Sequence, residues 1–389
     1  MIRDEPLQST TGTWGLGSAL ASRGGWGTAE TGRAFARARE LGETAQLLPV
    51  LWGLAVYHVD RAELPAAWEA AGELMQFVEE EKSGETASLM AAYRASGTVH
   101  YHLGELEQAR HCFERVLSLY REAEHRRLAV AYMTDFRVAA LSFLANLYFF
   151  LGYPDQAQTA CAESLAHARG TAHPSSLLLA LLWACYLTSV VPNAEATLAY
   201  AEDSVALCAE HNFADKLTEA AGHMACARAR LGVEDALAAA MHALDAHRAK
   251  GQERVTLLWL AIIAEAYSAA GRPEEGLRQL EDPLCRIERT REGWITAELH
   301  RLKGELLLAL PEPDHTGAEA SIRRALAVAR AQRARMWELR AATSLGRLWI
   351  GQGRRREALD LLAPVYGWFT EGLDTPGLRE AGALLDELR

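Results

Sequence analysis

The feature that most constrains this 389-residue chain is a recurring spacing of small and large residues. In residues 93–113, a large residue is followed by a small one four positions later and by another large one three positions after that. A glycine and then an alanine complete the pattern. Residues 141–157 repeat it, and close variants occur around Gly271 and Gly353. A unit of about 34 residues with these positions is typical of the tetratricopeptide repeat (TPR), a helix-turn-helix. The chain is therefore predicted to be an all-α, TPR-like α-solenoid.

Each position of this pattern has a physical role. Small residues such as Gly97, Gly304 and Gly346 let the two helices of one unit approach closely. A glycine after the first helix, such as Gly152, adopts a left-handed conformation without steric cost. One unit cannot bury its apolar face alone, so the units are expected to stack into a right-handed superhelix.

The pattern predicts about eight units and three regions of the chain. First helices are expected near 48–60, 86–102, 137–151, 174–190, 214–231, 253–270, 294–309 and 336–351. Second helices are expected near 63–80, 105–122, 154–169, 195–210, 233–249, 273–289, 316–332 and 355–370. The regions are an N-terminal arm or short helix at 1–27, a TPR-like superhelical domain at 28–375 and a capping helix at 376–389.

Composition and missing motifs disfavour several classes of function. The net charge is −11 and only four of the 40 basic residues are lysines, so an acidic surface argues against a nucleic-acid partner. No apolar run approaches the ~20 residues of a membrane span. No phosphate-binding Gly-x4-Gly-Lys loop, metal motif or catalytic motif is apparent, so we expect no cofactor and lean against an enzyme. Six cysteines without a Cys-x-x-Cys pair favour buried thiols and a cytoplasmic protein.

Several strings are more specific than a generic TPR. They are residues 41–54, 151–157, 298–306, 338–345 and 362–375. The last is the most distinctive, because no TPR position requires its Trp-Phe-Thr-Glu-Gly sequence. These strings resemble the C-terminal TPR region of bacterial signalling proteins that combine a nucleotide cyclase, an AAA-type ATPase and a TPR tail. More distantly, the chain is similar to the helical sensor domain of large ATP-dependent transcription activators.

This resemblance implies a sensing or docking module that regulates a neighbouring ATPase or cyclase. The chain departs from the family in lacking both of those domains. It also departs at residues 132–136, where the family has Tyr-Gly-Gln-Asp-Pro and this chain has Tyr-Met-Thr-Asp-Phe.

The first helices of TPR units line the concave inner surface of the superhelix, and four positions of each unit point into it. These positions supply the candidate ligand-binding residues, which are Trp52, Arg94, Thr98, Tyr101, Ser142, Asn146, Phe149, Tyr186, Glu265, Glu298, Arg301, Glu305, Arg340, Thr343 and Arg347. The N-terminal half of this set is mainly aromatic and neutral, and the C-terminal half alternates Glu with Arg. Two interpretations stay open: a solvated ladder of charge pairs, or a groove that clasps an anionic or peptide ligand through arginine forks.

Three functional hypotheses follow. The first is a non-catalytic scaffold or sensor that docks a protein or peptide. The second is a receptor for an amphipathic or anionic small molecule, closed by the arm around Trp14 and Trp26. The third is an enzyme built inside the groove, using for example Asp135, Tyr101 or Glu265. A homodimer is possible under any of them. A chaperone-tail carboxylate clamp is disfavoured, because the two relevant first helices supply only part of it.

Overall fold

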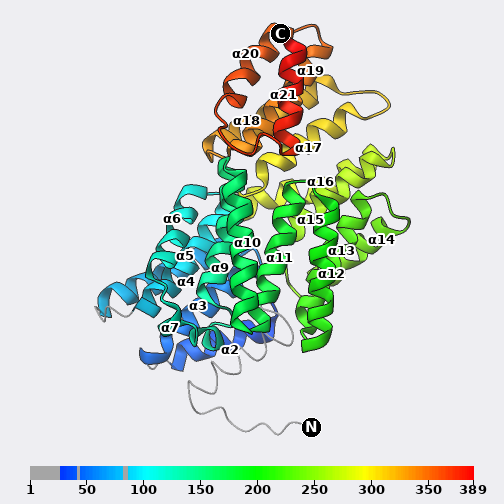
Figure 1. Cartoon of the computed structure of the whole chain (residues 1–389). Coiled ribbons are helices and arrows are strands. Elements are labelled where there is room, and N and C mark those ends of the chain that lie inside the picture. The colour runs from blue at the N-terminus through cyan, green and yellow to red at the C-terminus, as the bar shows by residue number, and fades with distance from the viewer. Residues whose placement is uncertain (1–26, 42–43, 82–85) are drawn as a thin grey trace.

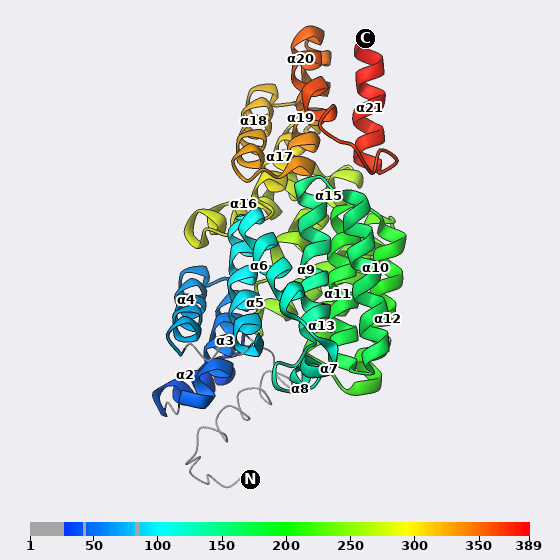
Figure 2. The same cartoon turned by 60° about the vertical axis from the view of Figure 1, so that its left-hand side comes forward.

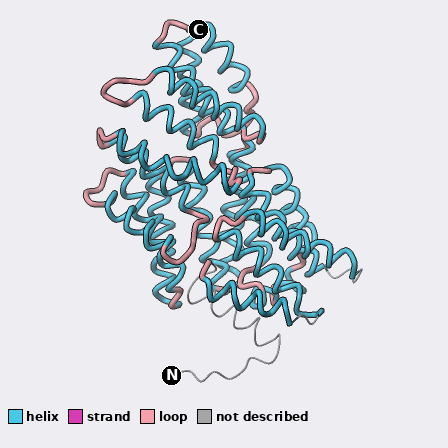
Figure 3. The backbone as a smooth tube through the Cα atoms, turned by 180° about the vertical axis from the view of Figure 1, so that it is seen from behind, coloured by secondary structure: helices cyan, strands magenta, loops and turns pink. Residues whose placement is uncertain are grey.

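The computed structural model describes residues 27–41, 44–81 and 86–389, and it is built of helices joined by loops. No strand occurs in these ranges, as Figures 1 and 3 show. The described residues also contain no helix that combines the length and apolarity needed to cross a membrane. The predicted arm lies outside the described residues, apart from residue 27.

The predicted helix pairs are confirmed as a TPR-like α-solenoid, with helix ends close to those expected from the repeats. The first helices of units 1 to 8 are α3 (Thr44–Asp60), α5 (Thr86–Leu103), α9 (Phe136–Leu151), α11 (Pro174–Val190), α13 (Ala214–Arg230), α15 (Thr256–Ala269), α17 (Thr296–Leu308) and α19 (Arg335–Gly351). The second helices are α4 (Leu64–Glu81), α6 (Leu106–Leu119), α10 (Pro154–Thr171), α12 (Ala194–His211), α14 (Ala236–Arg248), α16 (Pro273–Thr290), α18 (His315–Ala331) and α20 (Arg355–Tyr366). Helices α2 (Ala29–Leu41) and α21 (Pro376–Leu388) flank the units.

Glycines close and pack the repeats as the pattern predicts. Gly152 follows α9 in a left-handed conformation with φ of +96°, and Gly353 follows α19 with φ of +76°. Within α17, a Cβ atom at Gly304 would lie 2.5 Å from the side chain of Ile322 on α18. Such a contact is too short for any other residue, so glycine sets the close approach of these two helices.

The longer connection predicted at 122–136 contains two short helices, α7 (Glu122–His125) and α8 (Leu128–Ala131). Asp135 ends this connection as the N-cap of α9, and its carboxylate accepts hydrogen bonds from two backbone N–H groups and from the Tyr120 hydroxyl at 2.7 Å. All six cysteines are free thiols. Four are buried as expected, whereas Cys161 is half-buried and Cys285 is exposed.

The superhelix turns tightly enough for units five apart to touch. Between units 1 and 6, the Glu253 N–H donates to the Asp60 carbonyl at 2.6 Å. Between units 2 and 7, the Gly293 N–H donates to the His102 carbonyl at 2.7 Å. A Cβ atom at Gly293 would lie 2.1 Å from the Leu103 carbonyl oxygen, so glycine is required at this contact.

Units 3 and 8 form a third junction of the same kind. The Glu371 carboxylate, which follows α20, accepts the backbone N–H groups of Asp155 and Gln156 at 3.0 and 3.2 Å and so caps α10. The ring of Trp368 lies 5.6 Å from that of Tyr153. Figures 1 and 2 show the end of α10 beneath the layer formed by α17 to α21. Two strings of the family resemblance, 151–157 and 362–375, are therefore in direct contact.

Aromatic side chains fill the axis of the superhelix between its successive turns. Tyr101 of α5 stacks on Trp294 at 5.7 Å between ring centroids, and Phe150 of α9 lies 5.3 Å from Trp337 of α19. The rings of Trp183 and Tyr186 on α11 stack at 4.8 Å. In the described part of the chain the inner surface is not one continuous open groove, because a turn of only five units brings the inner faces of distant helices into contact.

Candidate functional site: a cavity at the end of the superhelix axis

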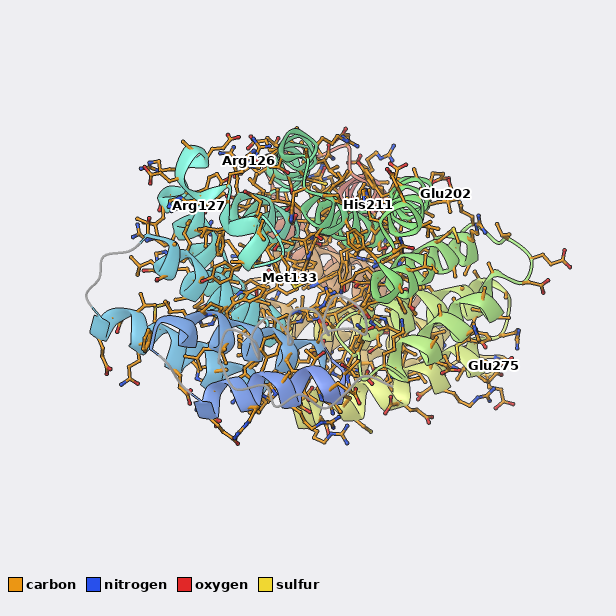
Figure 4. The ribbon with its side chains drawn as sticks, turned by 90° about the horizontal axis from the view of Figure 1, so that it is seen from below. Arg126, Arg127, Met133, Glu202, His211 and Glu275 are labelled. Carbon is orange, nitrogen blue, oxygen red and sulfur yellow. The ribbon has the colours of Figure 1, made fainter. Side chains whose placement is uncertain are left out.

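Part of the inner surface stays open as a cavity of about 160 Å³ at the N-terminal end of the aromatic axis. Its wall comes from α3, α5, α9, α11, α13 and the connections before α9 and α15. The apolar lining residues are Trp52, Val56, Val59, Tyr132, Met133, Phe143, Leu178, Leu179, Leu182, Trp183 and Phe213. The polar lining residues are Asp60, Arg94, Thr98, Thr134, Ser175, Asp215, Lys216, Glu219 and Arg254. The view along the axis in Figure 4 places Met133 near the centre of the molecule.

One side of the cavity carries a buried network of charges centred on Arg254. Its guanidinium donates to Asp60 at 2.8 Å and to both carboxylate oxygens of Glu219 at 2.8 and 3.0 Å. Lys216 lies 3.1 Å from Glu219 and 3.9 Å from Asp215. Burial alone would raise the pKa of Glu219, but the two cations hold it well below its ordinary value.

Asp215 is the least satisfied member of this network. Gln252 donates to its Oδ1 at 2.7 Å, whereas its Oδ2 is buried without a hydrogen-bond partner among the described residues. Burial raises the pKa of this carboxyl group. A buried carboxylate oxygen of this kind is costly unless another group approaches it.

Arg94 stands apart on the other side of the cavity. Its guanidinium lies over the ring of Trp52 at 4.9 Å and over that of Phe136 at 5.6 Å. The residue is 8% exposed, and its Nη1 has no hydrogen-bond partner in the described part of the chain. Burial lowers the pKa of Arg94 to about 10, so the side chain is charged at neutral pH.

The connection before α9 contributes a residue with a strained backbone, Met133, to the lining of the cavity. Met133 has φ of +59°, a left-handed conformation that costs a non-glycine residue about 1–2 kcal/mol. It occupies the position where the resembled family has glycine, which accounts for that preference. Asp135, proposed above as an alternative catalytic group, is committed instead to capping α9 and to Tyr120.

A second cleft, of about 250 Å³, lies among α15, α17, α19 and α21. Its charged groups are already paired with one another. Arg340 lies 2.8 Å from Glu298, Arg301 contacts Glu298 and Glu305, and Arg347 contacts Glu380. The anion-binding role predicted for these arginines stays a prediction.

The structure divides the predicted residues into three groups. Trp52, Arg94 and Thr98 line the first cavity. Glu265, Arg301, Glu305, Arg340, Thr343 and Arg347 line the second cleft. Tyr101, Ser142, Asn146, Phe149, Tyr186 and Glu298 are at least 95% buried within the packed interior. Whether any of them binds a ligand stays a prediction.

Sequence reasoning missed Asp215, Lys216 and Arg254, because they lie at or just before a helix start rather than at an inward TPR position. The signal that points to them is polar residues at the starts of α13 and α15, where the connections turn toward the axis. Among the described residues, no group of three or more His, Cys, Asp and Glu side chains is placed to hold a metal ion.

Comparisons with known proteins concern the fold alone. No protein-family model matches the chain, and no curated protein matches it either. Among solved structures, a Rap protein complexed with competence and sporulation factor is similar over 98% of this chain and 99% of that chain, with a TM-score of 0.60 at 9% sequence identity.

Two further solved structures resemble the chain less closely in shape. NprR in complex with its cognate peptide NprX covers 76% of this chain and 81% of its own, with a TM-score of 0.47 at 15% identity. A signal transduction ATPase with a tetratricopeptide repeat sensor, from Pyrococcus horikoshii, covers all of this chain with a TM-score of 0.46 at 14% identity. The chain matches only 55% of that ATPase. The similarity to the Rap protein agrees with the helical-repeat fold described above.

Proposed function

We propose that this chain is a non-catalytic TPR scaffold that holds a peptide segment of a partner, with one side chain of the peptide in the central cavity. The observation that carries the proposal is the cavity itself. It combines a wall of large apolar side chains with two buried charged groups, Arg94 and Asp215, each with one atom that has no hydrogen-bond partner among the residues the structure describes. Apolar pockets with a few unsatisfied polar groups are the usual form of a ligand site.

The size of the cavity supports a peptide that enters with one group. Its volume of about 160 Å³ is close to the ~150 Å³ of an apolar protein cavity that accepts benzene. A phenyl- or leucyl-sized side chain fits, while the rest of the ligand lies outside. A Rap protein, whose fold is similar, is described in complex with competence and sporulation factor.

The finer parts of the proposal concern origin and setting. We propose that the chain derives from the TPR tail of a signalling ATPase or cyclase and acts in the cytoplasm. The contact between residues 151–157 and 362–375 supports this origin, because it gives a structural reason for two of the resembling strings. The alternative of a small-molecule receptor uses the same cavity. Closure of the cavity by Trp14 and Trp26 concerns residues outside the described ranges.

A synthetic peptide pool tests the proposal. The purified protein is incubated with a randomised pool of short peptides, and retained peptides are identified by mass spectrometry after gel filtration. Thr98→Phe places a ring in the cavity from a half-buried position on α5 and is expected to abolish retention. Thr159→Phe adds the same ring to the exposed face of α10 and is the matched control. Equal retention by both variants, with unchanged helicity, would refute binding in this cavity.

A further inference from the structure

The charges that line the cavity divide into two groups. On one side, the carboxylates of Asp60, Asp215 and Glu219 face the cations of Arg254 and Lys216 across distances of 2.8 to 3.9 Å. This side carries a net charge of −1. It has no positive charge to spare for an anionic ligand.

In the part of the chain that the structure describes, the other side of the cavity holds a single buried cation, and no carboxylate there neutralises it by contact. Arg94 takes part in no ion pair among the described residues, and aromatic rings cover its guanidinium. The carboxylate that acts on it most is Asp135. That carboxylate already accepts hydrogen bonds from the Tyr120 hydroxyl and from the backbone N–H groups of Arg137 and Val138.

A buried cation without a partner reduces the stability of the folded protein unless an anion reaches it. Faces of aromatic rings offset only part of this cost. The guanidinium of Arg94 is therefore the natural place for a negative charge brought in from outside the chain.

The charge balance indicates what kind of anion fits. All six lining charges together sum to zero, so one carboxylate would neutralise Arg94 and leave the paired network intact. A phosphate would bring a second negative charge close to Asp60, Asp215 and Glu219. A planar carboxylate also matches the two parallel N–H groups of a guanidinium.

We propose that the cavity is a subsite for a carboxylate carried on a phenyl- or leucyl-sized apolar group, with Arg94 as its anchor. The apolar group packs against Trp52, Leu178 and Leu182, which line the same cavity as Arg94. This inference rests on the proposed function and gives the ligand its chemistry. In a peptide, the C-terminal residue has this form, and a free arylalkyl acid has it too.

Binding of two matched probes to the full chain tests the inference. N-acetylphenylalanine carries the carboxylate and the ring, and N-acetylphenylalaninamide carries the ring alone. Ligand-observed NMR titrations measure both dissociation constants. The wild-type protein is expected to bind the acid at least about tenfold more tightly than the amide, as a charge-assisted hydrogen bond implies.

Three variants test whether Arg94 causes the preference for the acid over the amide. Arg94→Gln is expected to lower the ratio to about one, and Arg94→Lys to leave an intermediate ratio because the planar fork is lost. Arg356→Gln removes an exposed arginine of α20, away from both cavities, and is expected to keep the wild-type ratio. Thermal melts of each variant confirm that it folds.

Several outcomes would overturn the inference: equal binding of acid and amide by the wild type, no binding of either, or a preference that survives Arg94→Gln. Each leaves the proposed function standing if the peptide pool is still retained and Thr98→Phe still blocks it. Two further pairs of probes distinguish a free acid from a peptide C-terminus as the carrier of the carboxylate. Dissociation constants are measured for 3-phenylpropionate and its amide, and for Gly-Gly-Phe and Gly-Gly-Phe-amide. Tighter binding of the peptide acid than of 3-phenylpropionate identifies a peptide C-terminus.

Discussion

At the scale of single residues, the molecule keeps ionisable groups where they reduce stability. Arg94 is buried between aromatic rings, and no carboxylate of the described ranges forms an ion pair with it. Asp215 has one oxygen without a hydrogen-bond partner among the described residues, although Lys216 lies 3.9 Å from it. Both line the same cavity, whereas the buried Arg301 of the second cleft contacts three carboxylates. Under the proposed function, such groups would gain their partners when a ligand binds, which accounts for their cost in stability.

Removal of the Arg94 charge is therefore expected to stabilise the empty protein. Arg94→Met keeps a long apolar side chain between Trp52 and Phe136 and removes the desolvated cation. We expect the free energy of unfolding to rise by about 1 kcal/mol or more, measured by urea denaturation. A structural arginine would behave in the opposite way, so a loss of stability would argue that Arg94 serves the fold rather than a ligand.

Buried histidines make stability depend on pH near neutrality. Burial lowers the pKa of His223 to about 4 against the opposing influence of Glu219, while Arg254 lowers it further. Burial also lowers the pKa of His247 to about 3. Because these groups are neutral in the folded protein and titrate near 6.5 when unfolded, the unfolded state binds more protons below pH 6.5.

Stability is thus expected to be full above pH 6.5 and to fall from pH 6.5 to about 4. Each histidine contributes a slope of up to about 1.4 kcal/mol per pH unit. His223→Gln removes one titrating group at similar volume, so its plot of unfolding free energy against pH should be flatter by that amount. An unchanged slope would show that His223 is accessible to protons in the folded protein.

At the scale of helices, most of the fold could be predicted from the sequence. The spacing of small residues and glycines placed every unit, because it reports local contacts within one helix pair. The ends of α5, α9, α15 and α19 lie within about three residues of the expected positions. Packing at single residues was harder to predict. The close helix contact expected at Gly346 is loose, because a Cβ atom there would lie an ordinary 3.5 Å from Leu384.

Three glycine-to-alanine changes separate backbone conformation from packing. Gly271→Ala adds a left-handed alanine with open space around it and is expected to cost about 1–2 kcal/mol. Gly152→Ala adds the same strain and a Cβ atom 2.5 Å from Trp368, so it should cost more, about 2–4 kcal/mol. Gly346→Ala should be neutral or stabilising by up to about 1 kcal/mol. Thermal and urea unfolding measure all three, and equal losses would disprove this distinction.

At the scale of the whole molecule, the curvature of the superhelix decides which inner residues can reach a ligand. Curvature accumulates from small rotations between units, and a repeat pattern does not report it. Trp52, Arg94 and Thr98 therefore face the inside of the superhelix, as their positions in the repeat predicted. For Tyr101 and Tyr186, the same positions became core, because the next turn of the superhelix lies against them.

The junctions between turns are expected to open independently of one another. Asp60→Asn weakens the contact of α3 with Arg254, which retains Glu219. Loss of a charge from a buried pair costs about 1–3 kcal/mol locally, so amide hydrogen exchange should become roughly tenfold faster in α3 and α4. Glu371→Gln should instead speed exchange at the start of α10, which the Glu371 carboxylate caps.

Each variant serves as the control for the other, because the two junctions lie at different levels of the superhelix and share no residue. Asp60 also lines the cavity. A ligand in the cavity should therefore slow exchange in α3 and α4 in the wild type and leave the start of α10 unchanged. Exchange that rises across the whole chain in both variants would mean that the superhelix opens as one cooperative unit, and that ligand binding cannot be transmitted through one junction alone.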